Sequence, residues 1–268
     1  MNILDVCATR TLDCGVVPIE LGVRAMYDCY SSRVAGYRIR AYINSILYGS
    51  LSPEDYFASI EHDAVGADFA KRNLRAVIKA APGISGEAPE PEIISVQCPQ
   101  AIFEGEDIYD ILRAVGRGAD AKIIKKMCLE FDGNLLCGDV RRLERIFADI
   151  RAAGWKIAVG GYGQRSFPMA ALADVPPDVV YMSAETVAML SDREKAASAR
   201  AFIRFATGLG IKVVAEGVTD DGQLRDLGSS ECFAYMPSTE YMGNRDCPGE
   251  ERDLSSFSRN AGGDGNEL

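Results

Sequence analysis

Short apolar runs alternate with helical patterns along most of the chain. Residues 34–43 alternate between apolar and polar types, which predicts a strand. A helix is predicted directly after it, because Ser52 suits an N-cap, Pro53 suits the first helical position, and acidic residues follow. Apolar residues then recur at helical spacing over 68–81. The first third of the chain therefore predicts strand and helix in succession.

From residue 93 onward the pattern becomes regular. Six apolar runs read as strands, over 93–99, 125–131, 156–161, 179–183, 212–217 and 231–236. The first five each precede a helical pattern, over 106–118, 139–154, 166–175, 191–210 and 220–228. Repeated strand–helix units predict a parallel sheet inside a ring of helices. Two earlier strands, one from about Val23 and one over 34–43, bring the total to about eight. Eight is the number of strands that closes a TIM-like (β/α)8 barrel. A doubly wound open sheet is the alternative.

Composition divides the chain into three parts. Residues 1–20 are a lead-in segment, 21–242 form the barrel domain, and 243–268 are polar, acidic and rich in Gly and Ser. The last part lacks the large apolar residues needed to bury surface, which predicts a disordered tail.

Charge narrows the possible partners. The 268 residues carry a formal net charge of −10, which argues against a general surface for nucleic acid or anionic membrane. No uncharged apolar run reaches the roughly 18 residues of a membrane span, so no membrane insertion is expected. Asp5, Arg10 and Asp13 interrupt the first apolar stretch, which argues against a signal peptide.

The thiols predict no zinc site. None of the eight cysteines forms a CxxC pair, and His62 is the only histidine. Cys98 and Cys128 lie in apolar runs and are interpreted as small core residues. Scattered thiols in a chain of this size suggest the reducing cytoplasm, and no cofactor is expected.

Five segments in order resemble one family. "GIKVVAEGVTDDGQLRDLG" closely resembles a signature near the end of EAL domains, the cyclic di-GMP phosphodiesterases. The segment "GWKIAVGGYGQRSF…LADVPPDVVYMS" is similar to that family's G-x-x-x-A-x-D-D-F-G-T-G … L-P-x-D-x-x-K-I-D segment. "VAGYRIRAYI", "ISVQCPQAIF" and "CLEFD" resemble its G-Y-E-A-L-x-R-W, V-N-L-S and L-E-I-T-E strands. The resemblance covers about residues 20–240 and implies a barrel with its site at the carboxyl ends of the strands.

The resemblance also implies that catalysis is lost. Family catalysis is metal-assisted, and hard oxygen ligands hold Mg²⁺ or Mn²⁺. The glutamate that names the family falls on Arg38, its leucine on Arg40, and the substrate-binding arginine just beyond on Tyr42. The metal-binding asparagine becomes Gln97. In the L-E-I-T-E strand the first glutamate is kept as Glu130, but the second falls on Gly133.

The later motifs change in the same way. The paired aspartates that bridge the metals fall on Gly160 and Gly161. The lysine that would assist the attacking water falls on Tyr181. Glu216 is kept, whereas the second glutamate of its motif becomes Thr219. The nucleotide-contacting Gln-Gly pair falls on Phe233 and Ala234. The remnant acids Glu130 and Glu216 are not expected to hold two divalent ions, so no catalytic or metal-binding residue is assigned.

The remaining polar residues allow several readings. Arg38 and Arg40 alternate with Ile39 and share one face of their strand, where they are expected to form an internal salt bridge with Glu130 and Glu216 or, alternatively, to hold phosphate. A general acid–base role for the two glutamates is the weaker alternative. The glycines of "AVGGYGQRS" lack the G-x-G-x-x-G spacing of a dinucleotide loop.

Aromatic residues suggest a contact surface. Tyr42, Tyr162 and Tyr181 are expected around the mouth of the old site, which they would fill or turn into a protein-contact surface. His62 is expected on the surface, away from every strand end. Phe167, Met169 and Leu172, within residues 164–175, are expected to form an apolar homodimer surface, with barrel core as the alternative.

Two functional classes follow. The favoured prediction is a catalytically inactive regulatory protein that recognises a cytosolic protein partner in cyclic di-GMP-related or motility signalling. The alternative is a receptor that binds cyclic di-GMP without hydrolysing it, with Arg38 or Arg40 replacing the lost phosphate contacts.

Overall fold

The strands close into a barrel. The computed structural model describes residues 19–45, 49–85, 90–104, 107–163, 168–239 and 251–254. Within these ranges eight strands follow each other around the ring in the order β1-β9-β8-β7-β6-β5-β4-β2, and pairing of β1 with β2 closes it. These strands are β1 (Ile19–Asp28), β2 (Val34–Ser45), β4 (Ile93–Gln97), β5 (Met127–Asp132), β6 (Lys156–Tyr162), β7 (Val179–Met182), β8 (Lys212–Val218) and β9 (Ala234–Pro237). The predicted (β/α)8 barrel is confirmed, and the open sheet is wrong.

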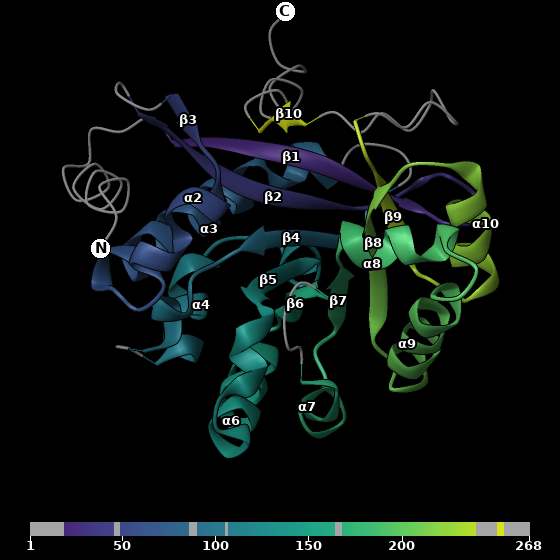
Figure 1. Cartoon of the computed structure of the whole chain (residues 1–268). Helices are drawn as coiled ribbons and strands as arrows, with labels where there is room; N and C mark the ends of the chain where they lie inside the picture. Colours follow the sequence, from purple (N-terminus) through teal and green to yellow (C-terminus); the bar gives the residue numbers. More distant parts are fainter. Residues whose placement is uncertain are drawn as a thin grey trace, which may run out of the picture.

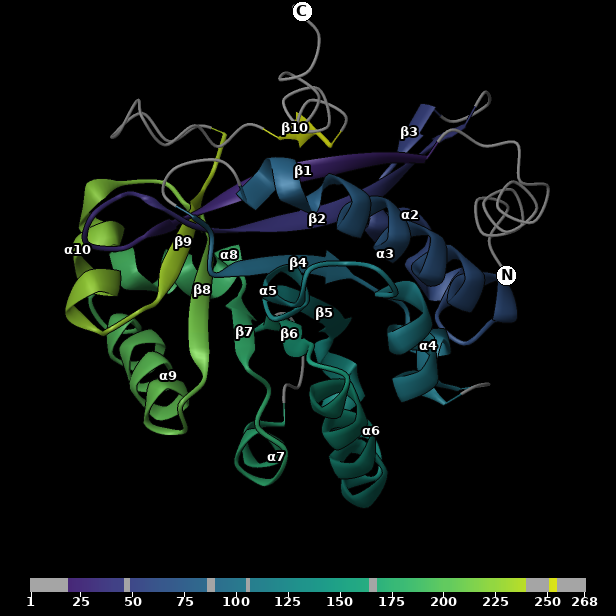
Figure 2. The same cartoon turned by 180° about the vertical axis from the view of Figure 1, so that it is seen from behind.

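Helices surround most of the barrel. They are α2 (Pro53–Ile60), α3 (Ala64–Ser85), α4 (Ile108–Val115), α5 (Ala121–Ile124), α6 (Val140–Ala152), α7 (Met169–Asp174), α8 (Ala184–Ala188), α9 (Ala196–Gly208) and α10 (Asp221–Ser229). Figures 1 and 2 show β1 and β2 on one side of the barrel and α6, α7 and α9 on the other. In the part of the chain described, none of the helices combines the length and apolar character that a membrane span requires.

Local signals set several of these elements. Helix α2 begins at Pro53 with Ser52 as its N-cap, as the sequence predicted, and the Asp55 side chain accepts a hydrogen bond from the Ser52 N–H at 2.8 Å. The helix predicted over 68–81 is the central part of α3. The helix predicted over 191–210 begins later, as α9, because a short 3₁₀ turn, Met189–Ser191, precedes it.

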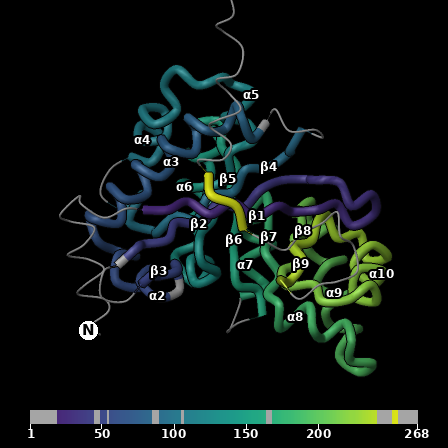
Figure 3. Tube along the Cα trace, turned by 90° about the horizontal axis from the view of Figure 1, so that it is seen from above, coloured from purple at the N-terminus to yellow at the C-terminus, as the bar shows by residue number. Residues whose placement is uncertain are grey.

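Two features of the sheet differ from the prediction. Strand β1 runs antiparallel to both of its neighbours in the ring, β2 and β9, so the sheet is not wholly parallel. Strand β10 (Arg252–Asp253) pairs antiparallel with β1, opposite Gly22 and Val23, and Leu254 is buried. Residues 251–254 are therefore part of the fold, contrary to the predicted disordered tail. Figure 3 shows β10 lying across β1. The rest of the tail prediction, for residues 243–250 and 255–268, falls outside the described residues.

The barrel interior is filled with apolar side chains, both small and large. Cys128, Ala158, Val179, Val214 and Ala234 belong to one buried cluster inside the ring. A larger apolar cluster lies between the strands and the helices. Side chains two positions apart on a strand face the same side of the sheet. Glu130 and Glu216, two residues after Cys128 and Val214, therefore also point into the barrel, at its carboxyl-terminal mouth. This alternation positions the candidate site.

Candidate functional site

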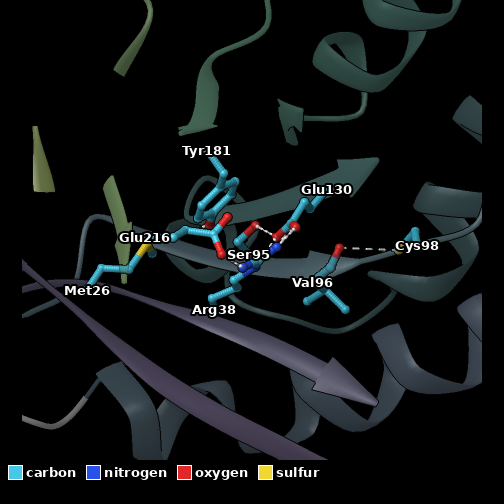
Figure 4. Close-up of polar contacts among 8 residues, drawn as sticks. All are labelled: Met26, Arg38, Ser95, Val96, Cys98, Glu130, Tyr181 and Glu216. Atoms are coloured by element: carbon cyan, nitrogen blue, oxygen red, sulfur yellow. Dashed lines mark hydrogen bonds and ion pairs between the residues drawn. The ribbon is translucent and has the colours of Figure 1, made fainter. Parts of the chain in front are cut away.

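Arg38 lies between two carboxylates at the carboxyl-terminal mouth of the barrel. Its Nε and Nη2 atoms donate to Glu130 at 2.9 Å and 2.5 Å, and its Nη1 donates to Glu216 Oε2 at 2.7 Å. These residues come from β2, β5 and β8, which are not neighbours in sequence. Figure 4 shows the Arg38 side chain with Glu130 on one side and Glu216 on the other. One guanidinium thus pairs with both of the acids that the resemblance keeps.

This ion cluster is mostly shielded from water. The side chain of Glu130 is 1% exposed, that of Arg38 9% and that of Glu216 25%. Burial by itself disfavours a charged guanidinium, but Glu130 and Glu216 outweigh it and hold the pKa of Arg38 above its ordinary value. Ser95 on β4 also donates to Glu130 Oε2, at 3.2 Å. Both carboxylate oxygens of Glu130 therefore accept hydrogen bonds from side chains.

Tyr181 forms the inner wall of the cluster. The Arg38 guanidinium carbon lies 4.5 Å from the centroid of the Tyr181 ring, a cation–π arrangement. The Tyr181 hydroxyl donates to Met26 Sδ at 3.5 Å. Burial, and secondly the charge of Glu130, raise the pKa of this phenol, so it stays neutral. A neutral phenol stands where the resemblance places a lysine.

The two glycines of β6 shape the other wall. A Cβ on Gly160 would lie 3.3 Å from Glu130 Oε1 and 3.9 Å from Arg38 Nη2, so this glycine faces the ion cluster directly. Gly161 has φ +78°, a left-handed conformation that favours glycine. The register of β6 against β7 shifts between Val159 and Tyr162. This bulge turns Tyr162 away from the barrel axis.

An open pocket of about 600 Å³ lies in front of the ion cluster. Its wall includes Gln97, Gly133, Gly160 and Gly161, together with Arg38 and both carboxylates. The sequence alone does not predict whether side chains fill the pocket at the barrel mouth; in the structure they leave it open. Within the described residues, no group of three or more His, Cys, Asp and Glu side chains is arranged to hold a metal ion.

The pocket also has a rim that the sequence did not reveal. Glu61 and His62, which follow α2, line it, and Asp132 lines it beside η2 (Gly133–Cys137). His62 is exposed, and its Nδ1 lies 2.8 Å from Glu104 Oε1, so it is a surface residue but not one remote from the site. Burial raises the pKa of Glu61 to about 7. Helix α2 packs beside the mouth only in the folded chain, so no local motif indicates these residues.

Other predicted residues do not gather in the pocket. Arg40 does not line it, and its guanidinium carbon lies 6.0 Å from the Tyr42 ring centroid. The Tyr42 hydroxyl donates to Glu251 Oε2 at 2.7 Å, because β2 extends past the mouth toward β10. Tyr162 stacks on Phe202 of α9 at 3.4 Å between centroids. The expected cluster of Tyr42, Tyr162 and Tyr181 is therefore wrong.

Two further positions serve local structure. The Thr219 backbone N–H donates to Gln223 Oε1 at 2.8 Å, which stabilises the first turn of α10. Phe233 precedes β9 and lies under the Lys212 ammonium, 4.0 Å from the ring centroid. Lys212 begins β8, so Phe233 lies at the amino-terminal end of the barrel. The predicted place of Phe233 in the nucleotide site is wrong for this reason.

Comparison with known proteins gives one consistent result. The family model described as EAL domain matches residues 23–236. An EAL enzyme, Bd1971, solved with cAMP and cyclic di-GMP, aligns with a TM-score of 0.79 at 16% identity, over 96% of this chain and 67% of its own. An EAL domain protein from Listeria monocytogenes gives 0.70 at 17% identity, over 97% and 98%.

A third structure extends this comparison. The FimX EAL domain from Pseudomonas aeruginosa, bound to cyclic di-GMP, gives a TM-score of 0.73 at 10% identity, over 93% of this chain and 100% of its own. None of the curated protein sequences matches this chain. At these identities the structural neighbours show the fold alone, and it is the barrel described above.

Proposed function

Because this chain belongs to the EAL domain family, we propose that it is a non-hydrolysing member that acts by binding a protein partner in cyclic di-GMP-related or motility signalling. The observation that carries this proposal is the position of Arg38. Its guanidinium occupies the space between Glu130 and Glu216, the two carboxylates that the resemblance assigns to metal binding.

The residues present do not fit a pair of divalent cations. Each Mg²⁺ or Mn²⁺ needs several hard oxygen ligands. Here the oxygens of Glu130 already accept hydrogen bonds from Arg38 and Ser95, and Glu216 Oε2 accepts another. Gly160 and Gly161 supply no side-chain oxygen. A cation placed between the glutamates would meet the positive charge of Arg38, so we derive no metal-dependent step.

The charge of the pocket also disfavours an anionic nucleotide. Among the described residues that line it, four carry carboxylates (Glu61, Glu130, Asp132 and Glu216), whereas one, Arg38, carries a permanent positive charge. Arg38 is already paired with two of the acids. A ligand with two phosphates would face uncompensated negative charge from Asp132, and from Glu61 when it is ionised. This distribution supports a protein partner over a nucleotide ligand.

A second candidate has one observation in its favour. The pocket of about 600 Å³ is open, and so has room for a small molecule. A receptor that binds cyclic di-GMP without cleavage is therefore the alternative. It requires the Arg38 guanidinium to leave at least one glutamate and to meet a phosphate instead.

Turnover and calorimetry together test the proposal. The full chain is incubated with cyclic di-GMP and Mg²⁺ or Mn²⁺, with an active EAL phosphodiesterase as the positive control. We expect no linear dinucleotide above background and no binding heat. Metal-dependent turnover that is lost in Glu130→Gln would overturn the proposal. Saturable, metal-independent heat that is lost in Arg38→Met but kept in Arg40→Met would establish the receptor instead.

The partner requires a separate test. Proteins that copurify with the tagged chain are expressed, purified and mixed with it, and the complex is measured by calorimetry. The Arg38→Met variant provides a second arm, because a partner that binds elsewhere on the barrel should be unaffected by it. The proposed role fails if no purified candidate binds the chain directly.

The proposed homodimer surface is smaller than the sequence suggested. Leu172 is fully buried in the core and cannot contribute to an interface, whereas Met169 on α7 is 36% exposed. Phe167 lies outside the described residues. We propose that Met169 lies at a self-association contact, and gel filtration of wild type and Met169→Glu tests it. A monomer at all concentrations would remove this contact from the account.

A further inference from the structure

A second depression lies at the opposite, amino-terminal end of the barrel. Its volume is about 340 Å³, and it is lined by the first residues of β6 and β8, Lys156 and Lys212, and by Arg151 at the end of α6. Asp178, just before β7, is the acidic residue in its wall. Three cations therefore converge on one small depression in a chain whose net charge is −10.

The fold directs two of these cations toward the barrel axis. Lys156 is two residues before Ala158, and Lys212 is two residues before Val214, and both of those residues belong to the interior cluster. Because side chains alternate along a strand, both lysines face the same interior end of the barrel. The Lys212 ammonium also lies on the face of Phe233, 4.0 Å from the ring centroid, which fixes its direction.

Neighbouring acids compensate these charges only in part. The Lys212 ammonium pairs with the carboxylate of Glu92. Arg151 Nη2 donates to Pro176 O at 2.7 Å and lies 3.3 Å from Asp178 Oδ2. Asp178 Oδ2 also accepts the Ile157 N–H at 2.9 Å. Among the described residues, two carboxylates, those of Glu92 and Asp178, pair with these three cations, which leaves one cation without a carboxylate partner.

That remaining charge falls on Lys156. Its Nζ donates to a backbone carbonyl, that of Glu92, at 3.1 Å, and within the described residues no carboxylate pairs with it. The side chain is partly buried. Burial, together with repulsion from Lys212, lowers the pKa of this ammonium. An anion in the depression would offset the repulsion between the Lys156 and Lys212 ammonium groups.

We propose that this depression binds a phosphate dianion, either inorganic phosphate or the phosphoryl group of a small monoester. Phosphate suits the site because it offers several acceptor oxygens to donors that approach from different sides, and arginine and lysine are its usual partners. Pro176, Pro177 and Leu209 form an apolar part of the wall, against which a small organic substituent would pack.

Calorimetry on the full chain tests this site, with inorganic phosphate and glycerol phosphate as separate probes at matched ionic strength in chloride. We expect saturable binding to wild type, with at least a tenfold weaker affinity in Lys156→Gln and in Lys212→Gln. Lys79→Gln, which removes the same charge from an exposed position on α3, should bind as wild type does. Tighter binding of glycerol phosphate would identify a monoester as the ligand, and equal or weaker binding would identify free phosphate.

Two results would overturn the proposal. One is the lack of saturable binding for both probes. The other is equal loss of affinity in Lys79→Gln and Lys156→Gln, which would mean that overall charge alone governs the effect. Thermal unfolding of each variant shows that the comparison is made between folded proteins.

Discussion

Replacing Arg38 with methionine should destabilise the protein strongly, because it leaves Glu130 buried without a cation. The methionine keeps most of the apolar stem but removes the donors to Glu130 and Glu216. Glu130 is 1% exposed, so water cannot replace the lost partner. Removing one member of a buried ion pair typically costs about 3–5 kcal/mol. For a chain of this size that corresponds to a fall in Tm of roughly 6–20 °C.

The pH dependence distinguishes a charge effect from a packing effect. In Arg38→Met the buried Glu130 carboxyl lacks a cation, which should raise its pKa in the folded variant. In the unfolded chain the same carboxyl is exposed and ionises above the ordinary glutamate pKa of about 4.3, so above that pH the folded state binds more protons than the unfolded state. Stability of the variant should therefore fall relative to wild type as pH rises above about 4.3, and the difference should shrink at lower pH. Urea unfolding across this range measures it.

Two matched variants make this prediction refutable. Arg40→Met removes the same side chain two residues along β2, outside the pocket, and should cost much less. Adding Glu130→Gln to Arg38→Met removes the stranded charge and should recover a large part of the loss. Equal losses in Arg38→Met and Arg40→Met, or a loss that does not change with pH, would refute the reasoning.

Three other predictions concern the same end of the barrel. Because burial raises the pKa of Glu61 to about 7, the folded protein bears the cost of a buried charge above that pH. Glu61→Gln should therefore raise the free energy of unfolding by about 1–3 kcal/mol above about pH 7 and change it little near pH 4.5. Urea unfolding at both pH values tests this, and an equal effect at the two pH values contradicts it. Gly160→Asp should destabilise by about 1–3 kcal/mol and restore no phosphodiesterase activity, because its carboxylate would meet Glu130; a turnover assay with Mn²⁺ and thermal unfolding decide. Gly22→Val should move the Glu251 side chain and break its hydrogen bond from Tyr42; loss of this contact should weaken the docking of β10, and limited trypsin digestion would then show faster cleavage near the carboxyl end than in wild type.

The strand ends of the barrel could be predicted from sequence because parallel strands align their carboxyl ends. Gln97 pairs in register with Glu130, and Glu130 with Ala158. Once the apolar runs were assigned to strands, Arg38, Glu130 and Glu216 were expected at one mouth, and they lie there.

Other features depend on contacts that no local pattern records. Tyr162 would face the mouth in a regular strand, but the bulge at Gly161 turns it onto Phe202. Glu61 reaches the pocket because α2 packs beside the barrel. The polar segment 251–254 is held by backbone pairing with β1. The prediction of disorder rested on side-chain composition and took no account of backbone hydrogen bonds. Each miss arises where tertiary contacts override local preference.

The position of Arg38 also makes a prediction about metal ions that can be argued from charge alone. Two glutamates at one barrel mouth repel each other unless a cation lies between them, and in this chain the guanidinium is that cation. Millimolar Mn²⁺ should therefore leave the Tm of the wild type unchanged beyond the effect of ionic strength. In Arg38→Met the same carboxylates lack a cation, so Mn²⁺ should raise the Tm of that variant, and Glu216→Gln added to it should abolish the rise. Stabilisation of the wild type by Mn²⁺ equal to that of the variant would mean that the metal binds elsewhere, and that the guanidinium does not replace it.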